Sequence, residues 1–104
     1  MEIASLSFLK GLPGVDAYRI AVMGHSSGGQ LTLLAAERDS TLRAAVTFGD
    51  SAAACWEGSS ERRARMLAAV RSTTVPIMLI HAANDCSTIP GHALAAELAK
   101  AGKP

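Results

Sequence analysis

Short apolar runs alternate with segments of helical periodicity along the sequence. Three runs are almost uniformly apolar, which is typical of strands that are buried on both faces of a sheet. Between them, apolar residues recur at helical spacing, and glycine or proline follows several of these segments. The predicted strands are RIAVM (19–23), RAAVTFG (43–49) and VPIMLIHA (75–82), and the predicted helices are residues 1–10, 30–38, 61–71 and 92–102.

This alternation predicts a parallel sheet. Each connection between strands is long enough to carry the chain back to the start of a parallel neighbour. We therefore predict an α/β fold with three parallel strands in sequential order and helices packed on the sheet. Both edges of such a sheet lack partners, so we expect residues 1–104 to be an incomplete α/β domain that self-associates through its exposed strand edges.

The stretch GHSSGG joins the first predicted strand to the next helix. Gly24 and Gly28 flank Ser26 in the pattern Gly-x-Ser-x-Gly, which at a strand-to-helix turn lifts a nucleophilic serine hydroxyl clear of the sheet. The glycines leave room for a strained backbone, and we expect Gly28 and Gly29 to open the helix. The backbone N–H of Ser27 would then point towards an oxyanion formed on Ser26.

Such a turn has two other interpretations. A glycine-rich turn can serve packing alone, or it can hold a phosphate at the helix N-terminus. The sequence has no Gly-x-x-x-x-Gly-Lys-Ser/Thr pattern and the turn has no Gly-x-Gly-x-x-Gly, so the chemical interpretation is favoured. Ser27 is the rival nucleophile, but His25 stands where its pattern requires glycine, so Ser26 is preferred.

Composition narrows the class of function. The net charge is +1 and the basic residues are scattered, apart from the short group Arg62–Arg65, so no nucleic-acid surface is expected. No apolar run approaches the roughly 20 residues that span a bilayer. The N-terminus has no signal-peptide pattern, so we expect a cytoplasmic protein without membrane partners. Cys55 and Cys86 lack metal-site spacing, and we expect no metal or cofactor.

Three longer stretches resemble the dienelactone hydrolase-like branch of the α/β-hydrolase superfamily. LPGVDAYRIAVMGHSSGG (12–29) resembles the family's run into its nucleophile elbow. VPIMLIHAANDCSTIPG (75–91) resembles its acid-bearing strand and loop, and LAAELAKAGKP (94–104) resembles the helix that follows. The resemblance implies a partial α/β-hydrolase fold with a nucleophilic mechanism. Dienelactone hydrolase itself has cysteine at the position of Ser26, a departure that leaves the substrate open.

The family order of nucleophile, acid and histidine implies roles for residues beyond the turn. Asp85, in the loop after the third strand, matches the acid that orients the histidine. Its other interpretation is an Asx-type turn residue, and Asp50, which ends the second strand, is the alternative acid. We expect His25 to pack beside the turn and His81 to be structural. His92 is the alternative base, because the family's own histidine follows one more strand, for which the sequence has no residues.

Two functions of different classes follow. The first is a serine hydrolase that acts on small-molecule esters or related acyl bonds, with a chain that is inactive alone because it lacks the catalytic histidine. The second is a non-catalytic α/β module that pairs its strand edges with a partner and keeps the turn as a relic or an anion site. Of the substrate pocket, only the loop SAAACWEGSSE (51–61) is visible, and we expect Trp56 in it to have an ordinary packing role.

Overall fold

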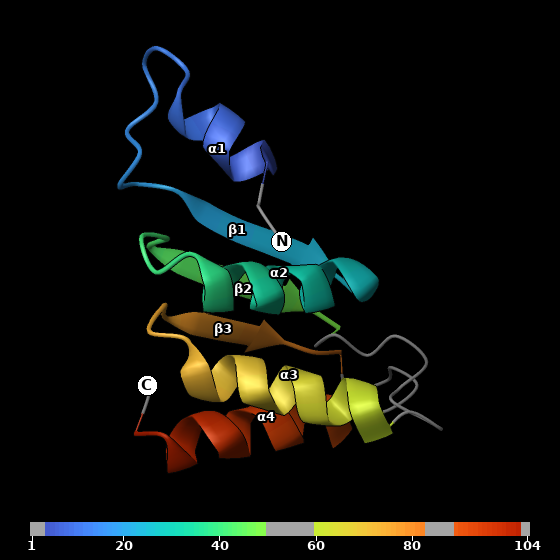
Figure 1. Cartoon of the computed structure of the whole chain (residues 1–104). Coiled ribbons are helices and arrows are strands. Elements are labelled where there is room, and N and C mark those ends of the chain that lie inside the picture. Colours follow the sequence, from blue (N-terminus) through green and yellow to red (C-terminus); the bar gives the residue numbers. More distant parts are fainter. Residues whose placement is uncertain (1–3, 50–59, 83–88, 103–104) are drawn as a thin grey trace.

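The computed structural model in Figure 1 describes residues 4–49, 60–82 and 89–102. Each predicted strand and helix is present within these residues. Three helices begin earlier than their predicted runs: one at Ser60 rather than Glu61, one at Ile89 rather than His92, and one at Ser27 rather than Gln30, next to the Gly28 and Gly29 that were expected to open it. The elements are α1 (Ala4–Lys10), β1 (Ala21–His25), α2 (Ser27–Arg38), β2 (Ala44–Phe48), α3 (Ser60–Ser72), β3 (Ile77–Ile80) and α4 (Ile89–Lys100). In the described part of the chain, no helix has both the length and the apolar character needed to cross a membrane.

The three strands form one parallel sheet in the order β1-β2-β3, which confirms the predicted topology. Val22 in β1 lies opposite Ala45 in β2, and Ala45 lies opposite Ile77 in β3. Because the strands are parallel, their carboxyl ends lie at the same edge of the sheet, where sites of α/β proteins form.

Helices α2, α3 and α4 pack against one face of this sheet. Helix α2 lies on β1 and β2, α3 packs on α2, and α4 packs on α3 and β3. The apolar side chains buried between these helices are Leu33, Met66, Ala69, Val70, Leu94 and Leu98. Burying each of the larger ones stabilises the fold by about 1.5–3 kcal/mol.

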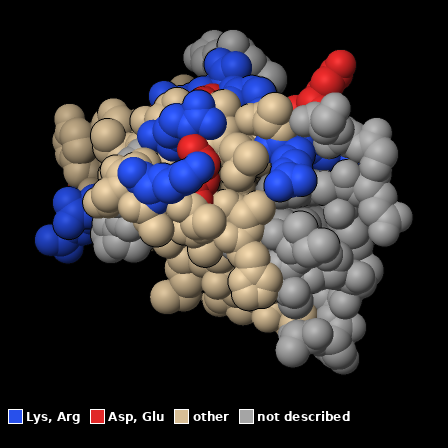
Figure 2. Space-filling model, turned by 90° about the horizontal axis from the view of Figure 1, so that it is seen from below, with Lys and Arg blue, Asp and Glu red and all other residues tan. Residues whose placement is uncertain are grey.

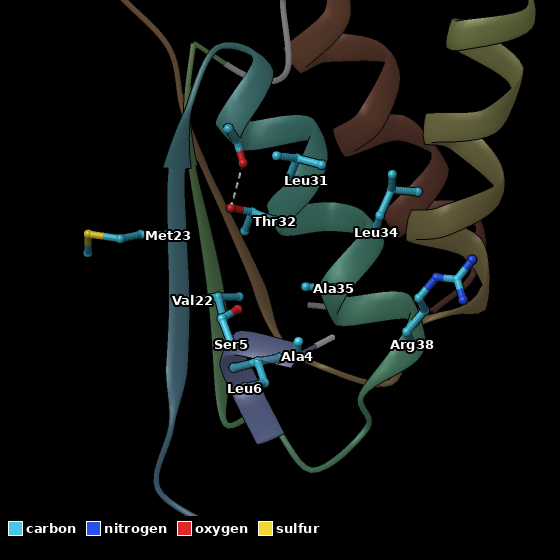
Figure 3. Close-up of a pocket in the computed structure, with 11 residues that line it drawn as sticks. Ala4, Ser5, Leu6, Val22, Met23, Leu31, Thr32, Leu34, Ala35 and Arg38 are labelled. Atoms are coloured by element: carbon cyan, nitrogen blue, oxygen red, sulfur yellow. Dashed lines mark hydrogen bonds between the residues drawn. The ribbon is translucent and has the colours of Figure 1, made fainter. Parts of the chain in front are cut away.

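The opposite face of the sheet carries none of the described helices, so the prediction of strands buried on both faces is wrong. Side chains alternate across β2, and Ala45 and Thr47 are fully buried against the helices. On the other face, Met23 of β1 and Met78 of β3 are 71% and 60% exposed. Figure 3 shows Met23 pointing away from all the helices in that view. An apolar sequence indicates a strand that tolerates burial, whereas actual burial depends on which elements cover each face.

Ion pairs join the helices on the covered face. Arg65 of α3 donates hydrogen bonds from both terminal nitrogens to the carboxylate of Glu37 in α2. Arg71 of α3 donates from Nε to Glu97 of α4 at 2.7 Å. These hydrogen bonds hold the pKa of each glutamate below its ordinary value. In Figure 2, basic side chains are spread over the visible face with acidic side chains among them.

Helix α1 is attached by one buried and one charged side chain. Leu6 is buried in a second apolar cluster that includes Ala45 of β2, which confirms that this helix lies against the sheet. At the end of α1, the Lys10 ammonium donates to the carboxylate of Asp39 and to the hydroxyl of Thr41. The Lys10 hydrogen bond, followed by that of the Thr41 hydroxyl, lowers the pKa of the Asp39 carboxyl.

Acid should therefore weaken the attachment of α1. A carboxyl group whose pKa falls on folding stabilises the protein above its unfolded-state pKa, about 3.9 for aspartate, and this stabilisation is lost as pH drops through the folded-state value. We expect Asp39→Asn to lower the thermal midpoint at neutral pH by a few degrees, for an ion pair worth up to about 1 kcal/mol. The difference should vanish in strong acid. Thermal unfolding at a series of pH values tests this, and equal midpoints at neutral pH would contradict it.

Candidate active site

One residue connects the edge strand to the helix beside it. Strand β1 ends at His25 and helix α2 begins at Ser27, so Ser26 alone makes the turn. Its φ is 56° and its ψ is −116°. Among the described residues, Ser26 is the only one other than glycine with a positive φ. The predicted unusual backbone of Ser26 is confirmed, and such strained positions cluster at functional sites.

Hydrogen bonds on both sides hold this strained backbone in place. The Ser26 N–H donates to the carbonyl oxygen of Phe48 at 2.9 Å, which extends the β1–β2 pairing by one residue. The Ser26 carbonyl accepts from the N–H groups of Gly29 at 2.9 Å and Gln30 at 3.3 Å, in the first turn of α2. The Ser26 hydroxyl makes no capping hydrogen bond to the helix, so capping does not occupy it.

The two glycines that flank Ser26 differ in what they contribute. A Cβ atom on Gly24 would lie 2.1 Å from the carbonyl oxygen of Gly28 and 2.6 Å from the Thr32 hydroxyl oxygen. A Cβ atom on Gly28 would meet no described atom within 4 Å. The expectation that both glycines make room for the turn is therefore correct only for Gly24. Gly28 and Gly29 do lie in the first turn of α2, as predicted.

The start of α2 offers hydrogen-bond donors beside Ser26. The N–H groups of Ser27 and Gly28 precede the first backbone bonds of the helix, so the helix itself provides no acceptor for them. They also lie at the positive end of the helix dipole. This arrangement can stabilise negative charge that develops on an oxygen attached to the carbon that bonds to the Ser26 oxygen.

The acid remains a prediction, because Asp50 and Asp85 both lie outside the described residues. The chain around them is placed in part. Gly49, directly after β2, has a φ of 74° and donates its N–H to the Ile80 carbonyl at 2.9 Å. The segments that lead to both aspartates therefore leave the sheet at the carboxyl ends of the strands, as Ser26 does.

The three histidines occupy different parts of the fold. His25 is exposed, because alternation along β1 places it with Met23 on the uncovered face. The prediction that it packs beside the turn is therefore wrong. His81 is half-buried directly after β3. His92 is exposed in the first turn of α4, which packs on α3 and β3, whereas Ser26 follows the strand at the opposite edge (Figure 1).

One residue near the turn is not identified by the sequence pattern. Thr32 lies within the helical run, yet it is only 4% exposed and its hydroxyl donates to the Gly28 carbonyl at 2.8 Å (Figure 3). The available signal was its spacing, since residues four apart in a helix lie one above the other. The contact with Gly24 has no counterpart in the sequence pattern, because it joins two elements.

Comparison with known proteins identifies the family. The profile of the dienelactone hydrolase family matches residues 1–104, and so covers every element described above. No curated protein sequence matches the chain. The parallel sheet with helices, and the strand–serine–helix turn within it, agree with part of an α/β-hydrolase fold. The chain therefore belongs to the dienelactone hydrolase family.

Proposed function

We propose that Ser26 is the nucleophile of a serine hydrolase that acts on ester or related acyl bonds. Family membership makes the chain a hydrolase of the dienelactone hydrolase type. The observation that carries the finer proposal is the strained backbone of Ser26, at a turn one residue long between a strand and a helix. A turn used only for packing has no need to hold a serine, rather than a glycine, at positive φ.

The proposed chemistry is acyl transfer in two stages. The Ser26 oxygen bonds to the carbonyl carbon of the substrate while its proton passes to a general base. The carbonyl oxygen takes up the negative charge, and the N–H of Ser27 stabilises it. The carbon–oxygen bond to the alcohol then breaks, and the base returns the proton to the leaving oxygen. Water hydrolyses the acyl-serine by the same steps and regenerates the free hydroxyl.

The proposed acid is Asp85, with Asp50 as the alternative, and the proposed base is none of the chain's three histidines. The exposure of His25 on the uncovered face supports this part of the proposal, as does the position of His92 on a helix at the far strand. A histidine supplied from outside these 104 residues would then complete the triad. Without it, the Ser26 hydroxyl stays neutral and is a weak nucleophile.

Turnover of a short-chain activated ester by the purified chain tests the proposal. We expect only a trace rate, because loss of a triad member costs several orders of magnitude. His92→Ala should leave that rate unchanged. Robust turnover that is abolished by both Ser26→Ala and His92→Ala would show instead that His92 is the base.

A second candidate function, association with another copy of the chain, is favoured by the uncovered face of the sheet. Met23, Met78 and Ile80 lie on it, and Ile80 is 40% exposed. Within the described residues, β1 pairs only with β2, and an apolar cavity of about 570 Å³ lies along its other side, between α1 and α2 (Figure 3). Apolar surface of this kind is typical of protein contacts, and an unpaired strand edge can pair with another chain.

Sedimentation analysis tests this association. We expect the chain to form dimers or larger species at micromolar concentrations, and the double variant Met23→Ser, Met78→Ser to shift towards monomer. The matched control is Phe8→Ser, which replaces a residue that is 70% exposed on α1, away from the uncovered face, and that does not line the cavity. A monomeric wild-type chain, or an equal shift in the control, would contradict the proposal.

A further inference from the structure

A buried threonine hydroxyl is connected to the Ser26 backbone through one peptide group. Thr32 donates from Oγ1 to the Gly28 carbonyl at 2.8 Å, drawn as the dashed line in Figure 3. That carbonyl shares its peptide group with the N–H of Gly29, which donates to the Ser26 carbonyl at 2.9 Å. The hydroxyl, the peptide group and the Ser26 carbonyl therefore form a continuous hydrogen-bonded chain, in which each bond polarises the next.

The strand limits movement of this hydrogen-bonded chain on one side. The Gly28 carbonyl oxygen and the Thr32 hydroxyl oxygen both lie within 3 Å of the position that a Cβ atom on Gly24 would take. The Gly28–Gly29 peptide group thus lies directly against the strand backbone. Without the Thr32 hydroxyl, that peptide group keeps its helical bonds but loses the side-chain donor that fixes the direction of the Gly28 carbonyl.

We infer that Thr32 is a positioning residue that holds Ser26 in its positive-φ conformation through the Gly28–Gly29 peptide group. The inference rests on the proposed function, in which that conformation presents the Ser26 hydroxyl to the substrate. A positive φ is unfavourable for serine, so the turn persists only while its surroundings enforce it. The hydrogen bonds that start at the Thr32 hydroxyl reach the Ser26 carbonyl. The peptide group of that carbonyl also provides the Ser27 N–H that is proposed to bind the oxyanion.

A purely structural role for Thr32 makes a different prediction. Helical threonines often bond the carbonyl four residues back, which satisfies a buried hydroxyl without any effect on neighbouring chemistry. Under that role, substitutions would change stability, and the reactivity of Ser26 would follow stability. Under the positioning role, reactivity follows the hydroxyl whichever way stability moves.

Two variants separate these roles. Thr32→Val keeps the shape and removes the hydroxyl, whereas Thr32→Ser keeps the hydroxyl and removes a buried methyl group. Each purified chain is treated with a fluorophosphonate probe in imidazole buffer, which supplies an external base, and the rate of labelling at Ser26 is measured. Thermal unfolding and amide hydrogen exchange at Gly29 are measured on the same samples.

We expect Thr32→Val to slow labelling of Ser26 by about tenfold and to speed exchange at Gly29, with a thermal midpoint close to that of the wild type. Thr32→Ser should label at nearly the wild-type rate although its midpoint is lower. Labelling of Thr32→Val at the wild-type rate would overturn the inference, as would a labelling rate that follows the midpoint in both variants. If the wild-type chain is not labelled at Ser26, the proposed function fails, and exchange at Gly29 still decides whether Thr32 holds the turn: unchanged exchange in Thr32→Val would overturn it.

Discussion

Gly24→Ala should destabilise the chain by at least about 3 kcal/mol, the upper end of the usual cost of overpacking. The added Cβ atom would lie 2.1 Å from the Gly28 carbonyl oxygen and 2.3 Å from the Gly28 carbonyl carbon. Both are backbone atoms, so no side-chain rotation relieves the clash and α2 must move away from β1. Because small domains are only marginally stable, we expect most of this variant to be unfolded even before urea is added. Urea denaturation followed by circular dichroism measures this.

The matched control is the same substitution at the other flanking glycine. A Cβ atom on Gly28 meets nothing within 4 Å in the described structure, and Gly28 lies in the first turn of a helix. Alanine is favoured over glycine in helices by about 0.5–1 kcal/mol, so Gly28→Ala should leave stability unchanged or raise it slightly. Equal destabilisation by the two substitutions would show that strand and helix do not approach as closely as described.

The order of the strands and helices along the chain could be predicted from the sequence, because it depends on local patterns. Three short apolar runs separated by segments of helical spacing allow few arrangements other than a parallel sheet. The helical periodicity of α2 and α4 begins only at Gln30 and His92, because both helices start on residues with low helix propensity, Ser27 to Gly29 and Ile89 to Gly91. For α2 the glycines of the turn indicated the earlier start, whereas for α4 nothing in the pattern did. Contacts between elements outweigh propensity there, and Pro90 is tolerated because the first turn of a helix does not use its missing N–H.

The candidate site could be predicted only in part. The pattern around Ser26 was sufficient to predict its backbone, because a turn this tight between strand and helix restricts both dihedral angles. The role of Thr32 could not be predicted, since it depends on a strand and a helix meeting at Gly24. The sequence could not decide which aspartate is the catalytic acid either. Asp50 and Asp85 follow neighbouring parallel strands, whose carboxyl ends lie on the same side of the sheet.

Ser26→Ala should abolish covalent labelling of the chain by a fluorophosphonate in imidazole buffer, with a decrease of at least about 100-fold. Removing a nucleophile leaves no atom to bond to phosphorus, so the effect should approach the full loss seen for nucleophiles in triads. Ser27→Ala should label within about threefold of the wild type, because the proposal uses only the backbone N–H of Ser27. This pair of variants compares adjacent serines that differ chiefly in backbone conformation.

Mapping the adduct by fragment-ion mass spectrometry is the most direct measurement of whether Ser26 is the nucleophile. Cleavage after Arg19 and Arg38 yields one peptide, residues 20–38, whose only serines are Ser26 and Ser27. We predict that the phosphonyl group is found on Ser26 in the wild-type chain and is absent from this peptide in Ser26→Ala. An adduct on Ser27, or labelling spread at equal rates over serines elsewhere in the chain, would contradict the assignment of Ser26 as the nucleophile.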